Sequence, residues 1–342
     1  MRVRNLFAIL FSVIILLITA GFGEAKTVNW KLGCGAGPNN PEYKILEAFT
    51  QKVDTYSEGQ FKIKILLTQP LGYGKDGILR FMKQGLAEAG LVLPNYLYRE
   101  DPAFGLLLPQ GVLVEKEDNV KLIAVMKEAL DKIYDKWGIS LKGPTWNGIM
   151  VDWVLIADEP ISTLEQLKGK KIRHSDKMIL KAFDKLGISA QFVSAADTYM
   201  SLKTGVIDGA VYGRLFVLKQ SLQEVTGYSS KMGPYSTAVM PGVGVSQKAW
   251  AKLPDDLKAI FEKAAKEVLW DDMFEKWKTE HYEKYSIAEL SKKGMKEIDP
   301  FPREDLLKLQ SATLEVWLKN CKKKGPEFVE HYKKVTSIIT KE

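Results

Sequence analysis

The sequence is poor in cysteine and histidine, with two and three residues among 342, which limits the chemistry it can support. Cys34 and Cys321 lie far apart in the chain, so a disulfide and two free buried thiols both remain open. No His-Glu-x-x-His motif and no Cys–His spacing typical of zinc is present, so we predict no metal site. The Gly-x-Ser-x-Gly motif of many esterases is also missing.

Other protein classes are excluded by composition. The 27 glycines and 14 prolines are too few for a collagen-like or low-complexity chain, and no repeat period is visible. A hydrophobic fraction of 46% with 27% charged residues is ordinary for a globular protein, and the length favours about two domains. The net charge of +7 arises from mixed basic and acidic residues, so we expect no nucleic-acid partner.

Long apolar runs are absent except at the start of the chain. Residues 6–18 are apolar apart from Ser12, follow Arg2 and Arg4, and precede a stretch of small residues that ends at Ala25. This pattern is typical of a secretory signal peptide over residues 1–25. The run is too short to span a bilayer, which needs about 20 residues, so a retained anchor is the less favoured alternative. We therefore expect an exported protein without direct membrane insertion after cleavage.

Apolar periodicity predicts two α/β units. Strands such as Val28–Leu32 and Phe61–Ile65, in which apolar and polar residues alternate, are separated by helices such as Pro41–Tyr56. A similar succession of strands and helices restarts over residues 170–212. This alternation favours mostly parallel sheets with helices on both faces. From Asp255 to Ser291 the pattern is helical throughout, which corresponds to about 55 Å at 1.5 Å per residue. A helix of that length must kink or run across two lobes.

A glycine-rich run invites a nucleotide-binding interpretation that we do not favour. Residues 72–77, Gly-Tyr-Gly-Lys-Asp-Gly, match G-x-G-x-x-G after a predicted strand. Three residues, Gln69 to Leu71, separate that strand from the first glycine, where the dinucleotide fingerprint needs a tight turn. We interpret the run as a glycine turn and predict no cofactor.

The strongest functional signal lies between Thr163 and Gly209. Arg173 ends a short predicted strand, Lys170–Arg173, and ligands of open α/β sheets bind beyond the carboxyl ends of strands. A guanidinium group at that place offers a planar fork to a carboxylate. From the residues alone, a structural arginine and a ligand-binding arginine are equally favoured.

Four runs together resemble the periplasmic solute-binding subunit of tripartite ATP-independent periplasmic (TRAP) transporters, the DctP family. They are Pro70-Leu-Gly72, Leu167-Lys-Gly-Lys-Lys-Ile-Arg173, Tyr199-x-x-Leu-x-x-Gly-Val-Ile-Asp-Gly209 and Trp250-Ala-Lys-Leu-Pro254. The resemblance covers essentially the whole chain after residue 25. It implies an α/β, two-lobed periplasmic binding protein fold with a long lobe-spanning helix, which closes on its ligand by hinge motion. It also implies a periplasmic location, a small organic-acid ligand and TRAP membrane subunits as partners.

The resemblance extends to boundaries and site residues. It implies one lobe of residues 27–149 plus about 239–275 and a second of residues 150–238 plus about 276–340. Arg173 occupies the position of the family arginine that grips the ligand carboxylate. The other implied cleft positions are Gly35, Tyr73, Asn95, Tyr96, Trp146, Asp176, Tyr212 and Met240.

Three departures from the family pattern narrow the expected ligand. Met150 replaces a frequent second arginine, Tyr212 replaces an asparagine, and Ser246 replaces an asparagine before the Trp-x-x-Leu-Pro run. The site therefore keeps one strong anion anchor and gains apolar and aromatic surface, including Met150 itself. We predict a monocarboxylate with an apolar or aromatic body, such as a 2-oxo acid or an aromatic acid, and Asp176 would also admit an amino acid.

Two alternatives accompany this prediction. Trp146 and Tyr96 are as easily explained by core packing, because aromatic residues dominate cores as well as sites. An exported two-lobed enzyme that acts on a small carboxylate is the alternative function. No nucleophile or acid–base pair stands out in the sequence to support it.

Overall fold

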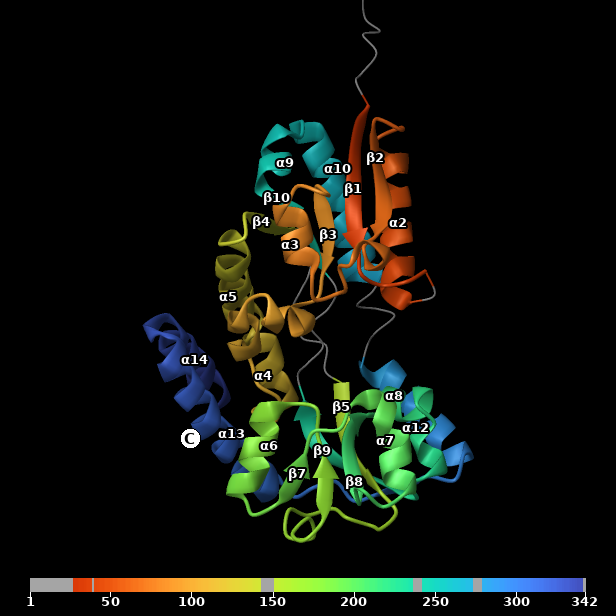
Figure 1. Cartoon of the computed structure of the whole chain (residues 1–342), viewed down its shortest axis with the longest axis vertical. Coiled ribbons are helices and arrows are strands. Elements are labelled where there is room, and N and C mark those ends of the chain that lie inside the picture. Colours follow the sequence, from red (N-terminus) through yellow and green to blue (C-terminus); the bar gives the residue numbers. More distant parts are fainter. Residues whose placement is uncertain (1–26, 39, 143–150, 236–241, 273–278, 341–342) are drawn as a thin grey trace, which may run out of the picture.

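A computed structural model describes residues 27–38, 40–142, 151–235, 242–272 and 279–340 of the chain. Over these ranges two mixed sheets, each with its own helices, form two lobes (Figure 1). The predicted signal peptide lies outside the described residues. No helix within the described ranges is both long enough and apolar enough to cross a membrane.

The first sheet has five strands in the order β2-β1-β3-β10-β4. They are β1 (Val28–Cys34), β2 (Phe61–Leu67), β3 (Ala89–Val92), β4 (Ile139–Lys142) and β10 (Gly242–Ser246). Strand β1 pairs in parallel with β2 and β3, whereas β10 runs antiparallel to β3 and β4. Buried and exposed side chains alternate in the first half of β2, where Phe61 and Ile63 are buried while Lys62 and Lys64 are exposed.

Helices cover both faces of the first sheet. They are α2 (Pro41–Tyr56), α3 (Ile78–Lys83), α4 (Lys116–Lys121), α5 (Ile123–Asp135), α9 (Gln247–Lys252) and α10 (Asp255–Ala265), with 3-10 helices η1 (Gln69–Leu71), η2 (Pro94–Arg99) and η3 (Pro102–Leu106). Helix α2 begins with Pro41, whose fixed φ suits a first helical position, and buries Phe49 and Val53. The ring of Phe49 meets that of Phe261 from α10 edge-on at 5.0 Å.

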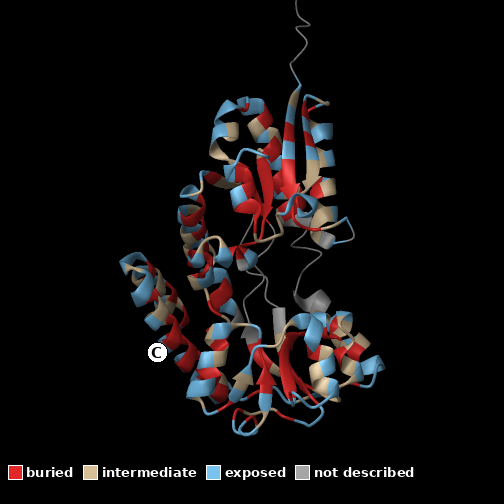
Figure 2. Ribbon diagram, in the orientation of Figure 1, coloured by how far each residue is buried: buried red, intermediate tan, exposed pale blue. Residues whose placement is uncertain are grey.

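The second sheet has six strands in the order β11-β9-β5-β8-β6-β7. They are β5 (Val151–Ala157), β6 (Lys171–Arg173), β7 (Ser189–Gln191), β8 (Gly209–Gly213), β9 (Tyr228–Tyr235) and β11 (Lys296–Ile298). Its helices are α6 (Lys177–Lys185), α7 (Ala195–Lys203), α8 (Arg214–Lys219), η4 (Leu222–Glu224) and α12 (Thr279–Lys292). Strand β6 is parallel to β7 and β8, and β5 is antiparallel to β8 and β9. In both lobes the buried residues follow the central strands and the inner faces of the helices (Figure 2).

The long helical run changes geometry and passes between the lobes, as its length predicted. Helix α10 places Phe261 in the core of the first lobe, and α12 places Leu290 in that of the second. Between them, Lys266–Asp272 form a π-helix, η5, before the chain leaves the described residues at 273–278. A π-helical turn is a recognised cause of helix bending. The helical geometry therefore changes at the point where the run leaves the first lobe.

Two C-terminal helices connect the lobes on one side (Figure 1). Helix α13 (Arg303–Lys324) packs against α6, and α14 (Pro326–Ile339) packs against α5. The indole Nε1 of Trp317 in α13 donates to the Leu106 carbonyl at 2.9 Å, so this helix also holds the first lobe. The domain boundaries implied by the resemblance stay a prediction.

Both cysteines are buried free thiols. Cys34 ends β1, and its Sγ donates to the Ala36 carbonyl at 3.4 Å. Cys321 lies in α13 within a different hydrophobic cluster. Burial raises the pKa of the Cys321 thiol to about 12, which suppresses the reactive thiolate. The sequence left open a disulfide or two free buried thiols, and the structure contains the free thiols.

Candidate functional site

The carboxyl ends of parallel strands in the two sheets face the crossing between the lobes. Strand β10 starts at Gly242, opposite the last residue of β3, immediately after the chain crosses from the second lobe. Strand β5 starts at Val151, after the opposite crossing, and its third residue, Trp153, pairs with Gly213 at the carboxyl end of β8. Because β6 is parallel to β8, the carboxyl end of β6 is directed toward the same edge, and Arg173 is its last residue, paired with Ala210. The two edges are therefore where an open α/β architecture binds ligands.

Arg173 is a buried cation without a described counter-ion. Its side chain is 4% exposed, and its Nε donates to the Val193 carbonyl at 3.0 Å, while Nη1 donates to the Val211 carbonyl at 3.3 Å. No described carboxylate forms an ion pair with it. Burial lowers the pKa of Arg173, yet a guanidinium stays charged at neutral pH. These two carbonyls fix the plane of the group and leave further N–H donors for an anion.

Tyr212, one of the implied cleft positions, lies against Arg173. The guanidinium carbon lies 4.2 Å from the centre of the Tyr212 ring, a cation–π contact. The phenol oxygen is 2.9 Å from Oγ1 of Thr198, which is fully buried in α7. Thr198 donates its own proton to the Ser194 carbonyl at 2.8 Å, so the Tyr212 hydroxyl donates to Thr198. The sequence analysis did not single out Thr198, although it lies beside the Tyr199–Gly209 run.

Asp176 caps a helix. Its Oδ1 accepts from the Met178 amide at 2.6 Å at the start of α6. Burial raises the pKa of Asp176, while hydrogen bonds from the backbone amides of Met178, Ile179 and Gln110 lower it in part. Gln110 belongs to the loop after η3, so the carboxylate also links the lobes. A ligand amine would have to compete with these amides for the carboxylate.

His174, next to Arg173, is fully buried and neutral. Its Nδ1 accepts from the Asp176 amide at 2.9 Å, and its ring stacks on Trp153 with centres 5.3 Å apart. Burial, assisted by the charge of Arg173, lowers the pKa of His174 to about 3. The side chain therefore anchors the end of β6 without adding a charge beside the guanidinium group.

The predicted residues of the first lobe gather around Lys75. A Cβ on Gly35 would lie 2.6 Å from the Lys75 amide nitrogen, so only glycine fits there. The Lys75 ammonium lies 5.2 Å from the ring centre of Tyr96, which is 43% exposed. Tyr73 turns into the lobe, with its ring edge-on to Phe81 at 5.1 Å.

Lys75 already has a carboxylate partner, Glu42, which the sequence analysis missed. Its Nζ lies 2.8 Å from Oε1 of Glu42 at the start of α2. Lys75 and, more weakly, Lys219 of α8 in the other lobe lower the pKa of Glu42 against the opposing effect of burial.

The remaining predicted positions give less information. Asn95 lies in η2 beside Tyr96, but its side chain is outside the described part of the structure. Trp146, Met150 and Met240 lie in the undescribed ranges 143–150 and 236–241. The structure therefore brings Arg173 together with Tyr212, and Gly35 together with the loop of Tyr73, whose Lys75 reaches the Tyr96 ring.

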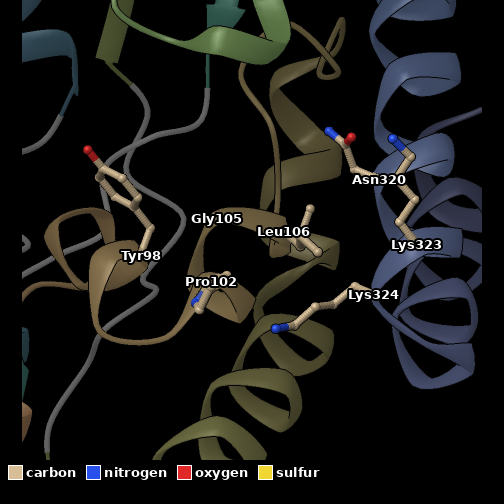
Figure 3. A pocket seen from close by; sticks show the side chains of 7 residues that line it. All are labelled: Tyr98, Pro102, Gly105, Leu106, Asn320, Lys323 and Lys324. Atoms are coloured by element: carbon tan, nitrogen blue, oxygen red, sulfur yellow. The ribbon is translucent and has the colours of Figure 1, made fainter.

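Two cavities lie away from Arg173. One of about 280 Å³ lies between η3 and the end of α13, and its lining includes Leu106 and Lys324 (Figure 3). The other, of about 480 Å³, lies between α12 and β11 and is lined in part by Ser229 and Glu297. Within the described ranges, no cluster of His, Cys, Asp and Glu side chains could hold a metal ion.

Comparison with known proteins gives a consistent result. The sequence pattern of DctP, described as bacterial extracellular solute-binding protein, family 7, matches residues 32–324. The ectoine-binding periplasmic protein TeaA of Halomonas elongata is 26% identical over 249 residues, which are 66% of this chain and 69% of TeaA.

Two solved structures have the same fold. DctP6 of Bordetella pertussis, an extracytoplasmic solute receptor binding pyroglutamic acid, has a TM-score of 0.66 at 22% identity and covers 90% of this chain and 100% of its own. A TRAP periplasmic solute-binding protein of Pseudoalteromonas atlantica, with bound sodium and pyruvate, has a TM-score of 0.69 at 23% identity and covers 92% and 94%. At these identities the likeness concerns the fold.

Proposed function

This chain belongs to the DctP family of bacterial extracellular solute-binding proteins, and we propose that it captures a monocarboxylate for a TRAP transporter. TRAP solute-binding proteins bind small organic ligands and work with TRAP membrane subunits. The family and the fold are those of receptors, which are not enzymes, so the exported enzyme is set aside. The individual ligand and the membrane subunits served by this chain are parts of the proposal.

The observation that carries the proposal is the state of Arg173. Burying a charge is costly unless it is paired, and no described carboxylate pairs with this guanidinium. Its two carbonyl contacts orient the group but do not neutralise it. A ligand carboxylate would supply the missing negative charge and form hydrogen bonds that contribute about 1.5–3 kcal/mol each.

The surroundings of Arg173 favour a single carboxylate on an apolar body. The Tyr212 ring supplies aromatic surface at the guanidinium, and Lys75 on the facing edge is already paired with Glu42. A second ligand carboxylate would therefore meet a satisfied ion pair. Ectoine, pyroglutamate and pyruvate, which the related proteins bind, each carry one carboxyl group. We infer a 2-oxo acid or a compact cyclic or aromatic acid.

Lobe closure would complete the site. Approach of the two edges excludes water and lowers the local dielectric constant, which strengthens the pair between Arg173 and a carboxylate. The cleft residues Trp146, Met150 and Met240 remain part of this proposal through the resemblance alone.

We place the protein in the periplasm. The N-terminal pattern of residues 1–25 is that of a signal peptide, and the family is described as extracellular. Mass spectrometry of the exported protein tests this point, with a mature N-terminus at Lys26 expected and an intact leader contradicting it.

Native mass spectrometry of the purified protein tests the function. We expect a bound acid of low mass, and calorimetric titration of ligand-stripped protein should show much tighter binding of pyruvate, pyroglutamate or phenylpyruvate than of succinate. Succinate is the matched control because it adds a second carboxylate to a similar carbon chain. Preference for succinate, or binding of none of these acids, would contradict the proposed ligand class.

A further inference from the structure

A second buried arginine, Arg214, lies beside the candidate site and binds a carboxylate. Arg214 is the first residue of α8, two residues after Tyr212, and is 3% exposed. Its Nη1 and Nη2 donate to the two carboxylate oxygens of Glu297 in β11. The hydroxyl of Ser229 in β9 donates to the same carboxylate at 2.6 Å. The carboxylate is thus held from two directions.

This ion pair connects elements that are not adjacent in the sheet. Strand β8 pairs with β5 and β6, whereas Glu297 and Ser229 belong to β11 and β9 on the other side of β5. The contact therefore ties the end of β8 to the far half of the sheet. It also ties that end to α12, which precedes β11 and continues the helical run from the first lobe.

Local helix energetics do not explain the arginine at this position. A cation at a helix N-terminus opposes the helix dipole, and a helix of six residues is too short to be stable by itself. Nor does the ion pair contribute much stability, because the Glu297 side chain is 38% exposed and solvent screens the interaction. What a bidentate arginine–carboxylate pair provides is a defined direction and separation.

The ring of Tyr212 is the part of the site that such a constraint would fix. Its hydroxyl is held by Thr198 of α7, and its backbone pairs with Val154 of β5. The chain then turns after Gly213 into the clamped Arg214. With the hydroxyl end and the following turn both held, the ring face stays under the Arg173 guanidinium.

We propose that the Arg214–Glu297 pair is a positioning device for the carboxylate site, which acts through Tyr212 on Arg173. Arg214 does not touch the ligand in this arrangement. It fixes the turn after β8, so that the ring offers one face to the guanidinium and that group keeps its hydrogen bonds to the Val193 and Val211 carbonyls. The inference rests on the proposed role of Arg173 in binding.

The test uses a signal that needs no ligand. In protein labelled with 15N-arginine, the Nε–H resonance of Arg173, assigned from its loss in Arg173→Lys, reports the bond to Val193. We expect Arg214→Met to shift or broaden this resonance, with a smaller change in Arg214→Lys and Glu297→Gln. Arg80→Met is the matched control, because it breaks an ion pair with Glu100 in the first lobe.

The same substitution in a Tyr212→Leu variant distinguishes a positioning role of Arg214 from a role in stability alone. In Tyr212→Leu the ring is absent, so Arg214→Met should cause no further change in the Arg173 resonance. A lower unfolding temperature of Arg214→Met with an unchanged resonance would overturn the proposal. So would an undiminished shift in the Tyr212→Leu background. If Arg214→Met does not fold, Glu297→Gln decides by the same criteria. Failure of Arg173→Lys to weaken pyruvate binding would count against the proposed function instead.

Discussion

The two facing edges carry the same pair of groups, a cation over a tyrosine ring, in opposite electrostatic states. On the second lobe Arg173 and Tyr212 are 4% and 5% exposed, and no described carboxylate neutralises the guanidinium. On the first lobe Lys75 lies over the exposed ring of Tyr96 and is paired with Glu42 at 2.8 Å. An internally paired cation is a structural contact, whereas a buried unpaired one is suited to an external anion.

The largest expected difference between the lobes is in acid. The pKa of His174 is lowered to about 3 in the folded protein against an ordinary value of 6.5, so the unfolded chain binds a proton first. The second lobe should therefore lose stability as the pH falls from 6.5 toward 3, by at most about 5 kcal/mol. Hydrogen exchange at β6 against β1 measures this difference, and His174→Gln should flatten the pH dependence. Equal acid sensitivity of both strands would remove the contrast.

The next effect concerns binding itself. Arg173→Met removes the unpaired cation and should weaken pyruvate or pyroglutamate binding by about a hundredfold, or about 3 kcal/mol, if two charge-assisted hydrogen bonds are lost. Lys75→Met, its counterpart on the first lobe, should change the affinity by no more than about twofold, because its half-buried ammonium is already neutralised by Glu42. Calorimetric titration of both variants measures the contrast, and similar losses in the two would refute it.

Support of the tyrosine ring has a smaller effect. Thr198→Val removes the acceptor of the Tyr212 hydroxyl, and leaving a buried donor unpaired costs about 1–3 kcal/mol of folding stability. We expect pyruvate affinity to fall by only a few fold, because the ring itself remains. Chemical denaturation and titration report the two effects separately. Thr204→Val is the matched control, since Thr204 is an exposed α7 C-cap residue.

Most of the fold can be predicted from the sequence, but only part of the electrostatic difference between the two lobes. Alternating strands and helices, and the position of Arg173 at a strand end, follow from local patterns. The pairing of Lys75 with Glu42 joins residues in separate elements, and no pattern along the chain marks it. Asp176 is a case in which a sequence pattern is visible but its meaning is not. An aspartate just after strand β6 can bind a ligand or cap the next helix, and the sequence does not distinguish the two roles. Whether a charge is already satisfied is decided by tertiary contacts, and so requires the structure.

The smallest expected effect tests the comparison most directly, because it gives the first lobe an unneutralised cation like that of the second lobe. Glu42→Gln removes the negative partner of Lys75 while keeping a similar shape, so the first lobe gains an unneutralised cation facing the second. Affinity for succinate should then rise by about threefold, or less than 1 kcal/mol, because the half-buried ammonium is still partly screened by solvent. Affinity for pyruvate should stay nearly unchanged, since its single carboxylate is taken by Arg173. The ratio of the two affinities, measured by titration of both variant and parent, isolates the charge on the first lobe. An unchanged ratio would mean that ligand choice is set by the shape of the cleft and not by which cation is already paired.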